Sequence, residues 1–170
     1  MRHILLTFFL VLSSLAAAAQ SNSIYIEDFE IVPDSVMEVS VMMANESPTR
    51  GLQLIVTLPQ GLSLESSELT PYSKSQHMSM VCEPKGDGYM VFVYSMNYVS
   101  YPVDTAAIVT LTIHAASSFK GGDIVISKAF GSSMENKTIP FDGGKATVTV
   151  PAASLIGIPI DQQSDDNRFF

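Results

Sequence analysis

The clearest alternation of apolar and polar positions runs from Thr49 to Glu65, in "TRGLQLIVTLPQGLSLE". Four aliphatic residues share one parity there: Leu52, Leu54, Val56 and Leu58. Successive side chains of a β-strand point to opposite faces, so this pattern predicts a strand with one buried face. Pro59 lacks a backbone donor and is expected to end the strand. Gly61 turns the chain, and a further strand begins at Leu62.

The same period of two recurs along most of the remaining chain. The sets expected on one face are Val39, Val41 and Met43; Met90, Phe92, Tyr94 and Met96; Val109, Leu111 and Ile113; Ile124 and Ile126; and Ala146, Val148 and Val150. In the first strand the period slips, because Ile24 and Ile26 share one parity whereas Phe29 and Ile31 share the other. One extra residue near positions 27–28 would restore the inward direction, which predicts a β-bulge there.

Turn residues separate these short segments. "KGDGY" (85–89) and "DGGK" (142–145) are predicted to be hairpin turns, since glycine adopts positive φ without strain. Eight or nine strands with frequent turns and no helical period predict an all-β fold, an antiparallel β-sandwich. The domain is expected to span residues 23–150. Residues 151–170 contain two prolines and no period, which predicts a flexible C-terminal tail.

The first nineteen positions have the pattern of a secretory signal peptide. Arg2 supplies the positive charge, residues 4–12 are apolar, and Ala17–Ala19 offer a small-residue cleavage site. The apolar run is short for a membrane anchor, so residues 1–19 are predicted to be removed. We therefore expect a protein without a transmembrane segment after cleavage, located in the periplasm, on the cell surface or outside the cell.

Charge and cysteine content narrow the classes of partner. The formal net charge is −8, and the nine Lys and Arg residues are scattered along the chain. This distribution argues against binding to nucleic acid or to anionic membranes, because both are held by grouped cations. Cys82 is the single cysteine, so no intramolecular disulfide can form. It lies among apolar residues and is interpreted as a small buried hydrophobic side chain.

No catalytic or metal-binding signature is found in the sequence. Apart from His3 in the predicted signal peptide, the histidines are His77 and His114, and neither is spaced with an acid and a serine as in a catalytic triad. The acidic residues Asp161, Asp165 and Asp166 lack the spacing of a calcium loop. The chain is therefore expected to be no enzyme and to require no metal or other cofactor.

The order of the strand motifs resembles that of the cohesin-like family, within the superfamily of carbohydrate-binding modules and cohesins. The motifs are "RGLQLIVTLPQGLSLE", "GYMVFVYSM", "AIVTLTIHA" and "FKGGDIVI", and the similarity covers roughly residues 24–150. The resemblance implies a nine-stranded jelly-roll of a secreted bacterial protein that binds a partner and does not catalyse. Cohesins bind dockerin modules in polysaccharide-degrading assemblies, so it also implies a dockerin-like or other surface protein partner.

The resemblance further implies where such a partner binds. It places the strand 89–96 beside the strand 52–58, and cohesins use the outer face of this sheet for dockerins. We expect Phe92 and Tyr94 to point inward. The residues then expected on the outer face are Gln53, Ile55, Thr57, Val91, Val93 and Ser95. Ile55 is the centre of this predicted site, with the alternative that a loop or the tail covers it.

Two other functions remain open from the residues alone. A carbohydrate-binding module would use exposed aromatic rings; tryptophan is absent, and Tyr98 and Tyr101 are the candidates. A structural or adhesive surface subunit would engage a neighbour through residues 151–170. In addition, "DSV" and "DTA" resemble O-glycosylation acceptors of some gut bacteria, at Ser35 and Thr105. Both tripeptides also fit an ordinary turn at the start of a strand.

Overall fold

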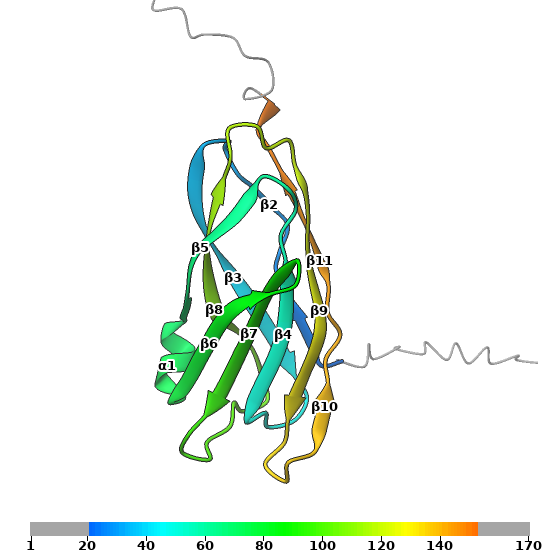
Figure 1. The fold of residues 1–170 in the computed structure, drawn as a ribbon. Coiled ribbons are helices and arrows are strands. Elements are labelled where there is room, and N and C mark those ends of the chain that lie inside the picture. Colours follow the sequence, from blue (N-terminus) through cyan, green and yellow to red (C-terminus); the bar gives the residue numbers. More distant parts are fainter. Residues whose placement is uncertain (1–20, 153–170) are drawn as a thin grey trace, which may run out of the picture.

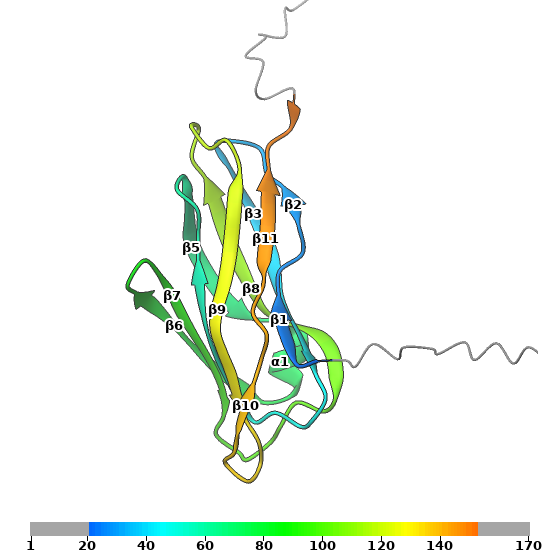
Figure 2. The ribbon, with the colours of Figure 1, turned by 90° about the vertical axis from the view of Figure 1, so that its right-hand side faces the viewer.

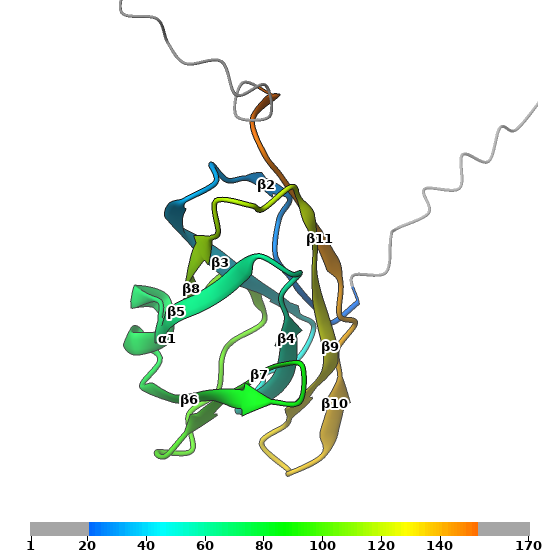
Figure 3. The same cartoon turned by 45° about the horizontal axis from the view of Figure 1, so that its top comes forward.

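Two β-sheets face each other in the computed structural model, which describes residues 21–152 (Figure 1). Figure 3 shows the two layers, and the buried side chains of the core come from both of them. The strands are β1 (Ser23–Tyr25), β2 (Phe29–Glu30), β3 (Ser35–Asn45), β4 (Gly51–Thr57), β5 (Leu62–Leu69), β6 (Met78–Lys85), β7 (Gly88–Ser95), β8 (Asp104–Ala115), β9 (Gly122–Ser132), β10 (Thr138–Pro140) and β11 (Lys145–Thr149). One short helix, α1 (Pro71–Ser75), joins β5 to β6.

The strand order confirms the predicted β-sandwich. One sheet has four strands in the order β1-β3-β8-β5, and the other has seven, in the order β2-β11-β9-β4-β7-β6 with β10 also paired to β9. Neighbouring strands are antiparallel except β2 and β11, which run parallel. The predicted signal peptide and most of the predicted tail fall in positions 1–20 and 153–170, which lie outside the described residues, and the domain limits stay a prediction.

The core includes the aliphatic sets that the alternation predicted, except in one strand. Leu52, Leu54 and Val56 of β4 are buried, and so are the predicted members of β3, β8, β9 and β11. Leu58 follows the end of β4 and is half-buried. Period-two burial therefore holds across both sheets, because each has one face packed against the other.

Strand β7 is the exception, since its two faces are reversed relative to the prediction. Val91 and Val93 are fully buried, whereas Phe92 is 39% exposed. The register explains the assignment: Val93 and Val91 lie opposite the buried Leu52 and Leu54 of β4. Both faces of this strand are apolar, so hydrophobicity does not distinguish them, and the prediction that the large rings of Phe92 and Tyr94 point inward was wrong. The smaller β-branched side chains fill the space between the sheets, and the rings cover the outside.

The phase slip in the first strand is resolved differently from the predicted bulge. The chain leaves the four-stranded sheet after Tyr25 and joins the other sheet at Phe29, where β2 pairs with β11 (Figure 2). Changing sheets reverses the side of the strand that faces the core. Ile24 and Ile31 can therefore both be fully buried despite their different parity.

The segment "DGGK" does not form a hairpin. It separates β10 from β11, two consecutive strands that pair with the same edge of β9. Both β10 and β11 pair antiparallel with β9, so they run in the same direction along it. Gly143 lies against β9, where an added Cβ would be 2.2 Å from the carbonyl oxygen of Ile126. The hairpin turn in this region is the earlier segment 133–137, closed by a hydrogen bond from Ser133 N to Lys137 O. The other predicted turn, 85–89, does connect the antiparallel neighbours β6 and β7.

Helix α1 was not expected, although its sequence carries a start signal. Thr70 is the N-cap and its hydroxyl accepts a hydrogen bond from Ser73 N, and Pro71 opens the first turn. The helix is too short to show a helical period. Cys82, on the edge strand β6, is half-buried and not buried as expected.

Candidate protein-binding face

The outer face of the seven-stranded sheet carries a cross-strand row of four residues, three of which are large and apolar. Val81 of β6 lies opposite Phe92 of β7, which lies opposite Gln53 of β4, which in turn lies opposite Phe130 of β9. We call these four residues the aromatic row. Its three apolar members are 39–44% exposed: Val81 44%, Phe92 39% and Phe130 41%. Cross-strand neighbours at this spacing form a continuous strip, and such strips mark sites of interaction.

Three of the six residues predicted for this face do lie on it. Gln53, Ile55 and Thr57 alternate with the buried residues of β4 and are half-buried. Ile55 lies between Met90 of β7 and Ser127 of β9. The predicted orientation of β4 is therefore confirmed, and Ile55 lies one row away from the aromatic row. That these residues bind a partner stays a prediction.

Two of the other three predicted residues, Val91 and Val93, contribute no outer surface, whereas Ser95 is half-buried and lines a cavity of about 300 Å³ beside Phe92. Val91 and Val93 belong to the core, as described above. Ser95 ends β7, and its hydroxyl accepts hydrogen bonds from the backbone of Asn97 and Val99, which shapes the following loop. The residues that replace Val91 and Val93 on the face are Phe92 and Tyr94, whose rings stack with centroids 5.1 Å apart. The alternation along β7 could be recognised in the sequence, but the sequence did not show which of its two faces points outward.

A hollow adjoins the aromatic row where β4 begins. Gly51 lies between Tyr94 of β7 and Ser132 of β9, and it has no side chain to fill the outer face. Two adjacent cavities of about 300 and 120 Å³ share Gly51, Phe92 and Ser132 in their walls. We call this depression the Gly51 hollow. An added Cβ at this glycine would lie 3.2 Å from the Ser132 Oγ.

Buried polar residues fix the loops that border the hollow. Tyr101 is fully buried, and its backbone exchanges two hydrogen bonds with Thr49, of 2.9 and 3.1 Å. Its hydroxyl lies 2.7 Å from Ser73 Oγ of helix α1. The Asn45 side chain donates to the carbonyl oxygens of Ser47 and Pro102. The β3–β4 and β7–β8 loops are thereby held together at the lower end of the molecule in Figure 1.

The rim of the hollow combines a cation with an aromatic ring. The guanidinium carbon of Arg50 lies 5.5 Å from the ring centroid of Tyr98. The Nη2 atom of Arg50 donates a hydrogen bond to Asn136 Oδ1. Tyr98 has φ +57° and is 74% exposed. A positive φ is uncommon for a residue with a side chain, so the anchored loop holds this ring outward at a cost in backbone strain.

Few titrating groups on this side of the molecule are perturbed. Hydrogen bonding by Ser133 lowers the pKa of the exposed Glu135, and the Lys145 ammonium lowers the pKa of Asp123. Burial raises the pKa of Tyr101 to about 12. All three shifts come from burial or from local hydrogen bonds and charges.

The described residues contain no arrangement suited to metal binding. Across residues 21–152, no group of three or more His, Cys, Asp or Glu side chains could hold a metal ion. His77 is exposed in the turn after α1, and His114 lies on the outer face of the four-stranded sheet. Neither histidine belongs to such a group.

None of the helices within residues 21–152 is long and apolar enough to cross a membrane.

The predicted sugar platform of Tyr98 and Tyr101 is wrong in its geometry. Tyr98 is exposed, but Tyr101 is fully buried and stacks on Tyr72 with ring centroids 5.9 Å apart. A buried ring cannot stack on a polysaccharide. The sequence-based support for the carbohydrate alternative is therefore lost.

Both candidate O-glycosylation residues begin strands. Ser35 opens β3 and its hydroxyl donates to Val32 O at 2.6 Å. Thr105, in β8, is exposed, and its backbone N–H donates to Asp104 Oδ1 at 2.7 Å. Of the two hydroxyls, that of Thr105 is the more accessible.

Comparisons with known proteins identify the fold. No protein-family model matches the chain, and no curated protein matches it in sequence. Several solved cohesin structures do match. A non-cellulosomal cohesin of Archaeoglobus fulgidus aligns with a TM-score of 0.62 at 13% sequence identity, and the alignment covers 76% of this chain and 91% of that chain. The sixth cohesin of Acetivibrio cellulolyticus scaffoldin B, solved with a Cel5 dockerin mutant, gives TM-score 0.64 at 13% identity, covering 77% and 99%. A cohesin module from a Clostridium perfringens family 33 glycoside hydrolase gives 0.61 at 9%, covering 77% and 97%.

These matches span nearly the whole of each solved module and most of this chain. Their low sequence identity limits the likeness to the arrangement of the strands. The resemblance stated from the strand motifs is thus confirmed at the level of architecture: the chain has the cohesin fold.

Proposed function

We propose that the protein is a non-catalytic binding module whose outer face, centred on the aromatic row and the Gly51 hollow, binds another protein. The observation that carries this proposal is the row itself: Val81, Phe92 and Phe130 are exposed together across neighbouring strands. A solvated sheet face is normally polar, as the Ser and Thr residues on the outside of the four-stranded sheet illustrate.

The shape of the face fits a protein partner. Large rings on a rigid sheet contribute contact area at little conformational cost, and a hollow beside them can receive a side chain from the partner. Two solved cohesins of the same fold are in complexes with dockerins of Clostridium thermocellum. A dockerin-like module is accordingly the first partner to test, in a polysaccharide-related or cell-surface setting.

The test compares two doubly substituted variants in a binding experiment. Phe92→Asp with Phe130→Asp places two charges on the proposed face. Ser40→Asp with Ser63→Asp places two charges on exposed positions of the other sheet and serves as the matched control. Each protein is immobilised and exposed to culture fluid of the source organism and to a panel of purified dockerins, and melting temperatures are recorded in parallel.

We expect the Phe92/Phe130 variant to melt near the wild-type temperature and to lose a partner that the wild type and the control both retain. Retention of that partner by all three proteins would refute the proposed face. A parallel polysaccharide affinity gel addresses the carbohydrate alternative: retention of the wild type on the gel, lost in the Phe92/Phe130 variant, would assign the same face to sugar instead.

Secretion belongs to the same proposal and is supported by the pattern of residues 1–19. It can be tested by expressing the full chain in a bacterial host and determining the amino terminus of the recovered protein. We expect cleavage after Ala19, giving a protein that begins at Gln20. Mass spectrometry of material from the source organism would also show whether Ser35 or Thr105 carries a sugar.

A further inference from the structure

The departure of the first strand from its sheet leaves part of β3 without a neighbour. Strand β1 pairs only with Met42–Ala44 of β3, and the chain then crosses to the other sheet. Within the described residues, no strand pairs with Met37–Val41 on this side, and no backbone hydrogen bond joins them to the crossover Ile26–Phe29. Strand β8 occupies only the other side. Alternate backbone amide and carbonyl groups of this segment are therefore free to pair.

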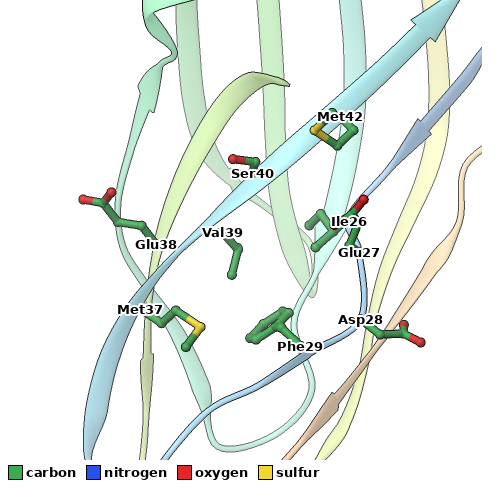
Figure 4. A pocket seen from close by; sticks show the side chains of 9 residues that line it. All are labelled: Ile26, Glu27, Asp28, Phe29, Met37, Glu38, Val39, Ser40 and Met42. Carbon is green, nitrogen blue, oxygen red and sulfur yellow. The ribbon is translucent and has the colours of Figure 1, made fainter. Parts of the chain in front are cut away.

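A cavity of about 250 Å³ lies along this free segment. We call it the edge groove. Figure 4 shows Met37, Val39 and Phe29 pointing toward one another across it. Val39 and Ile26, which are nearly buried, form its apolar floor, and the half-buried Met37, Phe29 and Met42 form its walls. An added strand could thus bury alternate apolar side chains against the core.

The rim of the edge groove is acidic. Its charged residues are Glu27, Asp28 and Glu38, all exposed, and no Lys or Arg lines it. Asp28 is engaged, because its Oδ1 accepts a hydrogen bond from Thr147 N. Neither Glu27 nor Glu38 forms an ion pair among the described residues. Glu38 points away from the groove, toward the outer face of the four-stranded sheet.

We propose that the edge groove binds an extended peptide segment of another protein as an added strand beside β3, in the position that β1 vacates. Side chains of a strand alternate between its two faces, so the segment has apolar residues facing Val39 and Ile26 and basic residues facing outward beside Glu38 and Glu27. Backbone pairing with β3 provides affinity, and this alternation selects the partner. Strand β3 belongs to the four-stranded sheet, whereas the aromatic row lies on the outer face of the seven-stranded sheet, so the two sites bind independently.

A blocked hexapeptide, Ac-Lys-Val-Lys-Val-Lys-Val-NH2, is the probe. Its counterpart with glutamate in place of lysine tests charge. Two further isomers carry N-methyl groups on all the valines or on all the lysines, and each removes the amide donors from one edge of the peptide strand. Binding is followed by changes in the amide NMR signals of the full folded protein, together with slowed amide exchange in Met37–Val41.

We expect the lysine peptide to perturb and protect Met37–Val41, and the glutamate peptide to bind at least about tenfold more weakly. The two N-methylated isomers should differ by about tenfold or more, because only one of them removes donors facing β3. Binding should weaken as salt is raised.

Charge reversal gives the sharper result. The Glu27→Lys/Glu38→Lys protein should prefer the glutamate peptide, whereas the control Glu46→Lys/Glu65→Lys, with the same change in net charge, should keep the wild-type preference. The Phe92→Asp/Phe130→Asp protein should bind the lysine peptide normally.

Three results would overturn the proposal: no binding of the lysine peptide to the wild type, protection that maps to the other edge strands β5 or β6, or an unchanged peptide preference after reversal at Glu27 and Glu38. The first result would mean that the acidic rim serves only to keep the free edge of β3 from pairing with other chains.

Discussion

Single buried side chains determine much of the stability of this fold, and Leu111 is a clear instance. It lies in β8 and is 1% exposed. Leu111→Ala removes several buried methyl and methylene groups and leaves a cavity, so the free energy of unfolding should fall by about 2–5 kcal/mol. Urea denaturation measures this change. Ser40→Ala, at an exposed position, is the control and should stay within about 0.5 kcal/mol of the wild type.

Two glycines on neighbouring strands should respond oppositely to alanine. A Cβ at Gly88 would lie 2.5 Å from the carbonyl oxygen of Val56, so Gly88→Ala must displace backbone and should be destabilising. A Cβ at Gly51 meets chiefly the Ser132 hydroxyl, which can rotate, so the stability of Gly51→Ala should stay close to that of the wild type. If both variants lost the same amount in melting temperature, the surroundings of Gly51 would not leave room for a methyl group.

The buried Tyr101 predicts a loss of stability in alkali. Its pKa is raised to about 12 in the folded protein by burial, whereas an unfolded tyrosine titrates near 10. Between these values the unfolded chain loses the proton and the folded protein keeps it, so the free energy of unfolding falls as pH rises from about 10 to 12. Below pH 10 this group contributes no pH dependence.

Urea denaturation at pH 8 and pH 11 checks the expectation for Tyr101. Tyr101→Phe should lose less stability between the two pH values than the wild type does, even if it starts lower because the hydroxyl contact with Ser73 is gone. An equal loss in both proteins would assign the alkaline instability to other groups.

At the scale of elements, β7 gives the most direct test of the fold. Val93 faces the core and Phe92 faces outward, so the same substitution should have opposite outcomes at adjacent positions. Val93→Asp buries an unpaired carboxylate and should prevent folding, because such a charge has no compensating partner. Phe92→Asp should leave the β-type circular dichroism spectrum and the melting temperature nearly unchanged. The reverse outcome would restore the orientation predicted from the sequence.

The whole molecule is held together by one core between two sheets, without covalent links. Cys82 is the single cysteine, so a reducing agent should not alter the melting temperature of a monomer. Because the same core supports both sheets, denaturation should be a single cooperative transition when followed by circular dichroism and by tyrosine fluorescence. Two separated transitions would indicate that one sheet unfolds before the other.

The alternation of apolar and polar residues was sufficient to locate most strands. It also identified the buried face of β3, β4, β8, β9 and β11. In these strands one face is aliphatic and the other contains polar residues, so the inward side follows from hydrophobicity alone. In β7 both faces are apolar, and hydrophobicity gives no preference. The pairing of Val91 and Val93 with the buried residues of β4 decides which face of β7 points inward. It thereby also decides which rings are exposed.

The candidate sites depended still more on long-range pairing. Gln53 and Ile55 could be placed on the outer face from their own strand, but Phe130 joins them only through the register between β4 and β9. The sequence by itself determined an all-β sandwich, the strand positions and a core free of disulfides, because these follow from local alternation and composition. Only the tertiary structure decided that the first strand changes sheets and opens the edge groove, and that Gly51 lies between two aromatic strands, because both depend on residues far apart in the chain.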